Sequence, residues 1–176
     1  MSCSRLTSVT IPSSVTTIEK YVFDSCSSLT SVTIPSSVVS IREGAFYKCS
    51  GLTSVTIPSR VISIGQNAFE GCSKLSSVYV SWSTPIKLKG AFYEETTTHC
   101  TLYVPQGTYQ DYIESDWNVF ENIVEYDPTG ISKPALSSDI KEVYRSTANG
   151  QLLKAPAKGL NIVKYSDGSV RKEMVR

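Results

Sequence analysis

The chain has 176 residues, of which 40% are hydrophobic and 19% are charged. This length is enough for one ordinary domain or two small ones, and it excludes a large multidomain enzyme. A formal net charge of +1 gives no general attraction to nucleic acid or to an anionic membrane, so we expect neither as a partner. No apolar run is long enough to span a bilayer, and the first residues do not have the charged segment and apolar stretch of a signal peptide. We expect a signal peptide to be removed or to lie in an N-terminal part that this sequence lacks.

A 23-residue period organises the first half of the chain. The cysteines at positions 3, 26, 49 and 72 are equally spaced, and the apolar residues between them keep the same phase. The matching positions are Leu6, Leu29, Leu52 and Leu75; Val9, Val32, Val55 and Val78; and Phe23, Phe46, Phe69 and Phe92. One such unit cannot bury its own apolar side, so we expect about four and a half units to stack into a solenoid with a continuous core.

Each unit is predicted to begin with a short strand. In the first unit, alternation places Val9 and Ile11 on one side of this strand and Ser8 and Thr10 on the other. Proline lacks the amide hydrogen that a central strand needs. The strands should therefore end at Pro12, Pro35 and Pro58. The rest of each unit should return along the other side of the solenoid as turns, 3-10 segments or short helices.

The fourth unit differs from the others, because the next strand, at residues 99–104, aligns with it only at a 24-residue spacing. A helix at about 108–116 follows, with Thr108 and Asp111 placed to cap its first turn. Residues 121–126 are predicted to form a last strand. We interpret these elements as a C-terminal cap of a solenoid that covers residues 1–126.

Beyond the cap, residues 127–140 have the Pro, Gly and Ser content of a linker. Residues 141–176 carry eight Lys and Arg against three Asp and Glu, whereas residues 1–140 carry nine against thirteen. Short apolar segments separated by Asn149-Gly150 and Asp167-Gly168 predict antiparallel hairpins. We therefore expect a small basic β module of four strands at 141–176.

The regularly spaced cysteines are predicted to be structural. Zinc ligands usually occur as close sequence pairs, and here the spacing is 23 residues, so no metal site is expected. Stacked cysteines would lie within disulfide range but with unfavourable dihedral angles. We expect a ladder of buried free thiols, formed by Cys3, Cys26, Cys49 and Cys72. Cys100 falls outside this ladder and is predicted to be the thiol that reacts first.

Catalytic chemistry has little support in the sequence. His99 is the only histidine, and by alignment it takes the inward position of Leu75, which favours a packed structural residue over a catalytic base. Glu94 and Glu95 are adjacent and favour a solvated turn over acid–base catalysis. No glycine-rich phosphate loop is present. We therefore expect no enzyme activity and no cofactor.

The outward side of the strands is the candidate binding surface. Two columns of small hydroxylated residues should run along it, with tyrosine in the last two strands and a tryptophan beside them. The predicted binding residues are Ser8, Thr10, Ser31, Thr33, Ser54, Thr56, Ser77, Tyr79, Trp82, Thr101 and Tyr103. Exposed aromatic residues are typical anchors in recognition surfaces. A merely solvated sheet remains an alternative, and so do both protein and glycan ligands.

The repeated unit Cys-Ser-x-Leu-Thr-Ser-Val-Thr-Ile-Pro-Ser-Ser-Val-x-x-Ile-x-x-x-Ala-Phe resembles the BspA-like (Treponema pallidum-type) leucine-rich repeat, over residues 1 to about 126. The C-terminal tail is similar to modules of surface proteins from Bacteroides-group bacteria. The resemblance implies a right-handed, mostly β solenoid whose short parallel strands line a concave face. It also implies a secreted or surface-attached adhesin that binds host matrix proteins or other surface glycoproteins, without catalytic residues.

Two hypotheses about function follow. In the first, the chain is a non-catalytic extracellular or cell-surface binding protein that recognises proteins or glycoproteins with its concave strand face. In the second, it is a structural spacer with no ligand of its own. We also expect that the first repeat, which has no polar cap, allows end-to-end self-association or continues a longer array.

Overall fold

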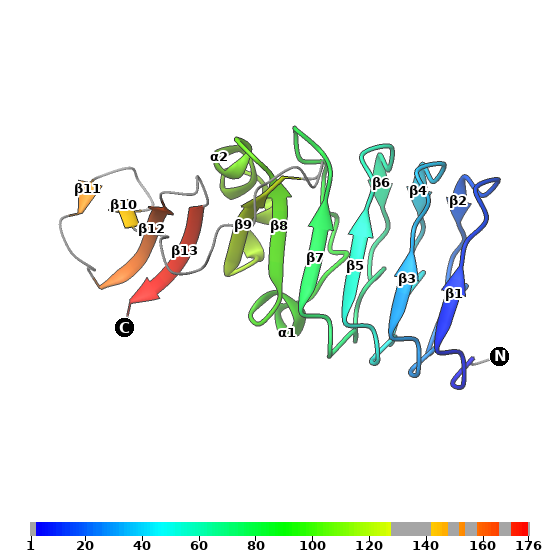
Figure 1. Ribbon diagram of the computed structural model, residues 1–176. Coiled ribbons are helices and arrows are strands. Elements are labelled where there is room, and N and C mark those ends of the chain that lie inside the picture. The colour runs from blue at the N-terminus through cyan, green and yellow to red at the C-terminus, as the bar shows by residue number, and fades with distance from the viewer. Residues whose placement is uncertain (1–2, 128–141, 148–151, 154–157, 166–169, 176) are drawn as a thin grey trace.

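The computed structural model describes residues 3–127, 142–147, 152–153, 158–165 and 170–175. Of the predicted linker, residues 128–140 lie outside this part. Six strands stand side by side in one parallel sheet along the elongated molecule (Figure 1). In sheet order they are β1 (Ser8–Thr10), β3 (Ser31–Thr33), β5 (Ser54–Ile57), β7 (Ser77–Val80), β8 (Thr101–Pro105) and β9 (Asn122–Tyr126).

The strand register follows the repeat. Val9 pairs with Val32, and Val32 pairs with Val55, each one period further along the chain. Val78 pairs with Leu102, which gives the expected 24-residue step. The solenoid that the repeat predicts is therefore confirmed. The strand of the fifth unit begins at Thr101, two residues later than expected, and ends at Pro105.

The return side of each unit is built from turns. A second parallel sheet forms there from three two-residue strands, β2 (Thr17–Ile18), β4 (Ser40–Ile41) and β6 (Ser63–Ile64). In the following turns, backbone amides alternate between local and inter-unit acceptors: Ala45 N–H donates to Arg42 O at 3.2 Å, and Phe46 N–H donates to Ala68 O at 2.8 Å. Units are thus joined by backbone hydrogen bonds on both sides of the core.

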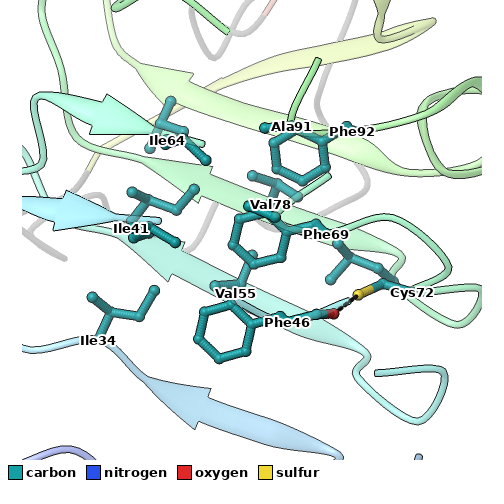
Figure 2. Close-up of a cluster of buried hydrophobic side chains, with 14 of the residues drawn as sticks. Ile34, Ile41, Phe46, Val55, Ile64, Phe69, Cys72, Val78, Ala91 and Phe92 are labelled. Atoms are coloured by element: carbon teal, nitrogen blue, oxygen red, sulfur yellow. Dashed lines mark hydrogen bonds between the residues drawn. The ribbon is translucent and has the colours of Figure 1, made fainter. Parts of the chain in front are cut away.

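A ladder of phenylalanine rings fills the centre of the core (Figure 2). Successive rings stack nearly parallel, with centroids 5.2, 5.2 and 4.9 Å apart from Phe23 to Phe92. These separations match the distance between neighbouring strands, about 4.7–4.9 Å. Each unit therefore contributes one ring to a continuous stack. At the cap, Phe120 ends it by meeting Phe92 edge to face, with centroids 5.2 Å apart.

The cysteine ladder lies beside the phenylalanine ladder, and its thiols are free. The Cys49 thiol donates a hydrogen bond to Phe23 O at 3.1 Å, and the Cys72 thiol donates to Phe46 O at 3.3 Å (Figure 2). The cysteines thereby satisfy backbone carbonyls of the preceding unit inside the core. Cys26, Cys49 and Cys72 are buried, but the prediction was wrong for Cys3, which is exposed in the first unit.

The cap has three short helical elements instead of one longer helix. They are α1 (Glu94–Thr97), α2 (Tyr109–Ile113) and the 3-10 helix η1 (Asp116–Val119). The predicted capping by Thr108 and Asp111 was wrong, because the Thr108 hydroxyl donates back to Pro105 O at 2.7 Å. Glu125 on β9 instead accepts hydrogen bonds from the amides of Gly107 and Tyr109, both at 2.9 Å. The last strand of the sheet therefore fixes the start of α2.

A separate four-stranded antiparallel sheet follows the solenoid, with the order β11-β10-β12-β13. Its strands are β10 (Glu142–Thr147), β11 (Leu152–Leu153), β12 (Gly159–Tyr165) and β13 (Val170–Val175). β13 packs near β9, at the cap end of the array (Figure 1). Lys172 on β13 donates a hydrogen bond to Asn118 O in η1 at 3.3 Å. Burial lowers the pKa of this lysine.

Phe69→Ala is expected to lower the free energy of unfolding by about 3–5 kcal/mol, because it removes a fully buried ring that stacks on both sides. Tyr93→Ala is the control, since this ring is 42% exposed. The control should cost less than about 1 kcal/mol. Urea denaturation measures both values, and equal losses would contradict a central role for the ladder.

The buried thiols predict a loss of stability at alkaline pH. Burial raises the pKa of Cys49 to about 12 and raises that of Cys72 as well. An unfolded cysteine ionises near pH 8.5, so the contribution of each thiol is complete below that pH and falls as the pH rises towards the folded pKa. At pH 9.5 the loss is about 1.4 kcal/mol for each thiol.

The double variant Cys49→Ser, Cys72→Ser keeps a donor for each carbonyl and removes these ionisations. It should lose less stability than the unmodified chain between pH 7.5 and 9.5. Urea denaturation at several pH values tests this. Tyr109 and Tyr112, whose pKa values burial also raises, are present in both proteins and cancel in the comparison. Identical pH dependences would contradict the prediction.

Glu125→Ala is expected to lower the free energy of unfolding by about 1–2 kcal/mol, because two amides at the start of α2 lose their acceptor. Asp111→Ala is the matched control in the same helix. Asp111 is exposed, and its removal should change stability by less than about 0.5 kcal/mol. Thermal unfolding of the two variants compares them, and a larger effect of Asp111→Ala would support the sequence-based assignment of the cap instead.

Candidate functional site

The outer strand face is the side of the six-stranded sheet that points away from the core. Strand pairing brings the predicted residues into two columns. The first column contains Ser8, Ser31, Ser54, Ser77 and Thr101, and the second contains Thr10, Thr33, Thr56, Tyr79 and Tyr103. The first two strands expose both of their members, and towards the cap the columns become half-buried. None of these ten residues carries a charged side chain.

Beside these columns, a line of hydroxyl groups at the strand starts joins each unit to the preceding one by hydrogen bonds. The hydroxyl of Thr30 donates to Thr7 O at 3.1 Å, that of Thr53 to Thr30 O at 3.2 Å, and that of Ser76 to Thr53 O at 3.2 Å. These side chains bond to backbone carbonyls at the beginnings of the strands. The Ser and Thr content of the repeat thus serves two purposes, joining units at the strand starts and covering the outer strand face.

Tyrosines gather on the outer strand face at the cap end. The rings of Tyr79 and Tyr103 stack with centroids 4.3 Å apart and an angle of 10° between their planes. Tyr126 meets Tyr79 edge to face at 5.5 Å, and its hydroxyl donates to Val80 O at 3.2 Å. We call Tyr79, Tyr103 and Tyr126 the tyrosine cluster. Sequence analysis missed Tyr126, although alternation along β9 would have placed it on the same side as Asn122.

The assignment of Trp82 to the binding surface was wrong. Trp82 is only 5% exposed, and its indole N–H donates to Val61 O at 2.7 Å. Its ring packs against Trp117 of the cap, with centroids 5.7 Å apart. The tryptophan fills the interior where the fourth unit departs from the repeat.

A shallow hollow of about 440 Å³ lies where the strands β5, β7 and β8 end. Four of its lining residues carry hydroxyl groups, and the other two are Trp82 and Pro105. The lining consists of Ser59, Ser81, Trp82, Ser83, Thr84 and Pro105. Pro105 pairs with Tyr126 of the tyrosine cluster. The hollow and the cluster are therefore neighbours.

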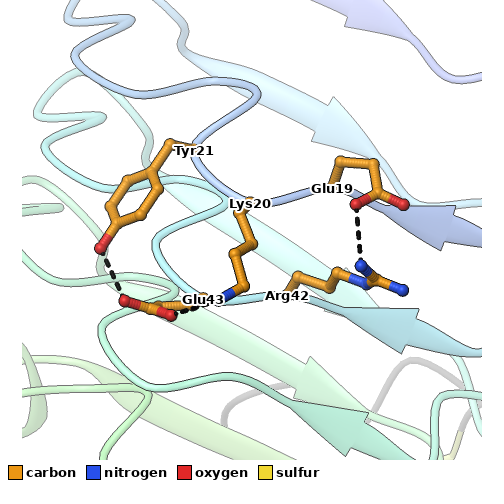
Figure 3. Close-up of polar contacts among 5 residues, drawn as sticks. All are labelled: Glu19, Lys20, Tyr21, Arg42 and Glu43. Atoms are coloured by element: carbon orange, nitrogen blue, oxygen red, sulfur yellow. Dashed lines mark hydrogen bonds and ion pairs between the residues drawn. The ribbon is translucent and has the colours of Figure 1, made fainter.

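Charged side chains pair on the return side of the first two units (Figure 3). Lys20 lies 2.8 Å from a carboxylate oxygen of Glu43, and Arg42 lies 3.2 Å from Glu19. The Tyr21 hydroxyl donates to the other Glu43 oxygen at 2.9 Å. These hydrogen bonds, first that from Lys20, lower the pKa of Glu43. The pairs are exposed and add little stability, but they contrast with the uncharged columns of the outer strand face.

Two further expectations about single residues were wrong. His99 is exposed instead of packed inward. Cys100 is fully buried, and burial raises the pKa of its thiol to about 12, so it is a poor candidate for the most reactive cysteine. Cys3 is the exposed thiol among the five cysteines. Glu94 and Glu95 are exposed as expected, in the first turn of α1.

Within the described residues, no three His, Cys, Asp or Glu side chains come together in a group able to hold a metal ion. In the same part of the chain, none of the helices has the length and apolar character needed to cross a membrane.

The match to a family model agrees with the architecture. The family model of the BspA type leucine-rich repeat region matches residues 1–114 in six copies, more than the four and a half units expected from the period. A crystal structure of a leucine-rich repeat protein from Eubacterium ventriosum is 26% identical, with a TM-score of 0.44. The match covers 62% of this chain and 31% of that protein, so the chain spans about a third of its length.

No curated protein matches the sequence significantly. The family model covers well over half of the chain, and the repeat it describes is the one whose strands, register and core are seen in the structure. This chain belongs to the BspA-type leucine-rich-repeat family.

Proposed function

We propose that this chain is a non-catalytic binding protein, displayed on a bacterial surface or secreted, and that it recognises protein or glycoprotein partners with its outer strand face. Proteins with this type of repeat are typically bacterial surface or secreted proteins, and leucine-rich repeats are typically non-catalytic. The partner class we propose is host extracellular-matrix proteins or other surface glycoproteins.

The observation that carries this proposal is that one side of each strand packs into the core, whereas the other side points outward and is not needed for packing. Val32, Val55 and Val78 point into the core and hold the units together. Their neighbours Thr33, Thr56 and Tyr79 point outward, in register. The outward side chains can therefore vary without disturbing the core. Hydroxyl groups both donate and accept hydrogen bonds, and aromatic rings provide apolar contact area, as recognition surfaces require.

A triple substitution tests the role of the outer strand face. Ser31→Lys, Thr33→Lys and Ser54→Lys add three charges to neighbouring positions of the two columns. Because a ligand would have to bury these charges without counter-charges, capture should fall at least tenfold. The measurement is binding of the purified chain to immobilised extracellular-matrix proteins and mucin, each tested separately.

The control carries the same three charges elsewhere, as Ser27→Lys, Gln66→Lys and Ser73→Lys at exposed turn positions outside the two columns. It should bind like the unmodified chain, and circular dichroism should show that both variants fold. Binding that survives the first set would place the site off the outer strand face. A chain that captures none of these glycoproteins would overturn the proposal and favour a structural spacer.

A further inference from the structure

We infer that the hollow at the ends of β5, β7 and β8, together with the tyrosine cluster beside it, is a subsite for an uncharged oligosaccharide. This inference rests on the proposed binding function and specifies its ligand: the part of a glycoprotein that is recognised here is a neutral sugar chain. Three properties of the site, described below, carry the inference: its position, its mixture of hydroxyl and apolar groups, and its lack of charge.

The hollow, which is lined mainly by hydroxyl groups, lies next to the aromatic rings of the tyrosine cluster. Ser81, in the lining of the hollow, directly follows Val80, whose carbonyl accepts the hydrogen bond from Tyr126. Pro105, also in the lining, pairs with Tyr126 in the sheet. The hollow therefore borders the strand position that carries Tyr126, beside the tyrosine cluster.

The lining presents groups that suit a sugar ring. Ser59, Ser83 and Thr84 are exposed, and their hydroxyl groups can both donate to and accept from sugar hydroxyls. Trp82 is only 5% exposed and its indole N–H is bonded to Val61 O, so it borders the hollow with little free surface and offers a ligand no donor. The rings of the tyrosine cluster add apolar faces. A pyranose has the same two kinds of surface, hydroxyl groups at its edge and C–H groups on its faces.

The charge distribution selects a neutral ligand. None of the six lining residues, and none of the three tyrosines, is charged at neutral pH. The six lining residues offer a sulfated or carboxylated sugar no cation to offset the hydration that it would lose. The ion pairs of the first two units lie on the return side instead. Binding should therefore depend little on ionic strength, since no salt bridge forms.

The test is a glycan array that carries neutral, sialylated and sulfated oligosaccharides, probed with the full chain. Isothermal titration of the strongest neutral glycan follows, at 50 mM and 500 mM NaCl. We expect neutral glycans to bind and the dissociation constant to change less than twofold between the two salt concentrations. Binding of acidic glycans alone, or a tenfold weakening by salt, would overturn the inference.

Variants locate the site. Tyr103→Ala should weaken binding at least tenfold, whereas Tyr103→Phe, which keeps the ring, should stay within about threefold. Ser83→Lys, at an exposed position of the hollow, should also weaken it at least tenfold and tests the site without altering the tyrosine stack. Tyr93→Ala, which removes an exposed tyrosine directly before α1, is the control. Unchanged affinity in Ser83→Lys would overturn the inference.

The two proposals can fail separately. If no glycan binds, but the chain still captures matrix proteins in a manner that the Ser31, Thr33 and Ser54 substitutions abolish, the inference falls and the proposed function stands. Removal of neutral glycans from a captured glycoprotein by glycosidase gives the same distinction. Capture that persists after deglycosylation means that the polypeptide is recognised, and it overturns the inference alone.

Discussion

The structure depends on one constraint, which is that every unit must advance the chain by the spacing between neighbouring strands. The phenylalanine rings repeat at 4.9–5.2 Å, and the backbones bond to each other on both sides of this stack. A change of length inside a unit would break both the ring stack and the hydrogen bonds. The additional residue of the fourth unit is accommodated where a cap begins, with α1 inserted before β8.

This constraint explains why the polar residues inside the units are so uniform. Buried carbonyls of one unit need donors from the next, and the thiols of Cys49 and Cys72 supply them. At the strand starts, Thr53 and Ser76 do the same from a more exposed position. The outward side chains of the strands are not needed as donors to these carbonyls. The outer strand face keeps Ser and Thr over the first three strands, and threonine in the second column gives way to Tyr79 and Tyr103 only towards the cap.

The cap combines the end of the core with the tyrosine cluster of the outer strand face. Trp117 and Phe120 close the phenylalanine stack, and Glu125 fixes the start of α2. The same strand that carries Glu125 contributes Tyr126 to the tyrosine cluster. Closing the core and assembling the proposed glycan subsite are thus two results of adding β8 and β9 to the sheet.

The sequence by itself determined the period, the strands, their register and the two outward columns, because each of these follows from a repeated alternation of apolar and polar residues. Only the tertiary structure decided which residues outside the repeat are buried and which are exposed. Cys100 turns inward because its amide bonds to Thr96 O at the end of α1, while His99 remains exposed. Trp82 is buried because its ring packs against Trp117 of the cap and its indole N–H finds an acceptor in Val61 O. The period offers no template for these positions, so their direction depends on contacts with the cap, which are local for Cys100 and come from Trp117 for Trp82.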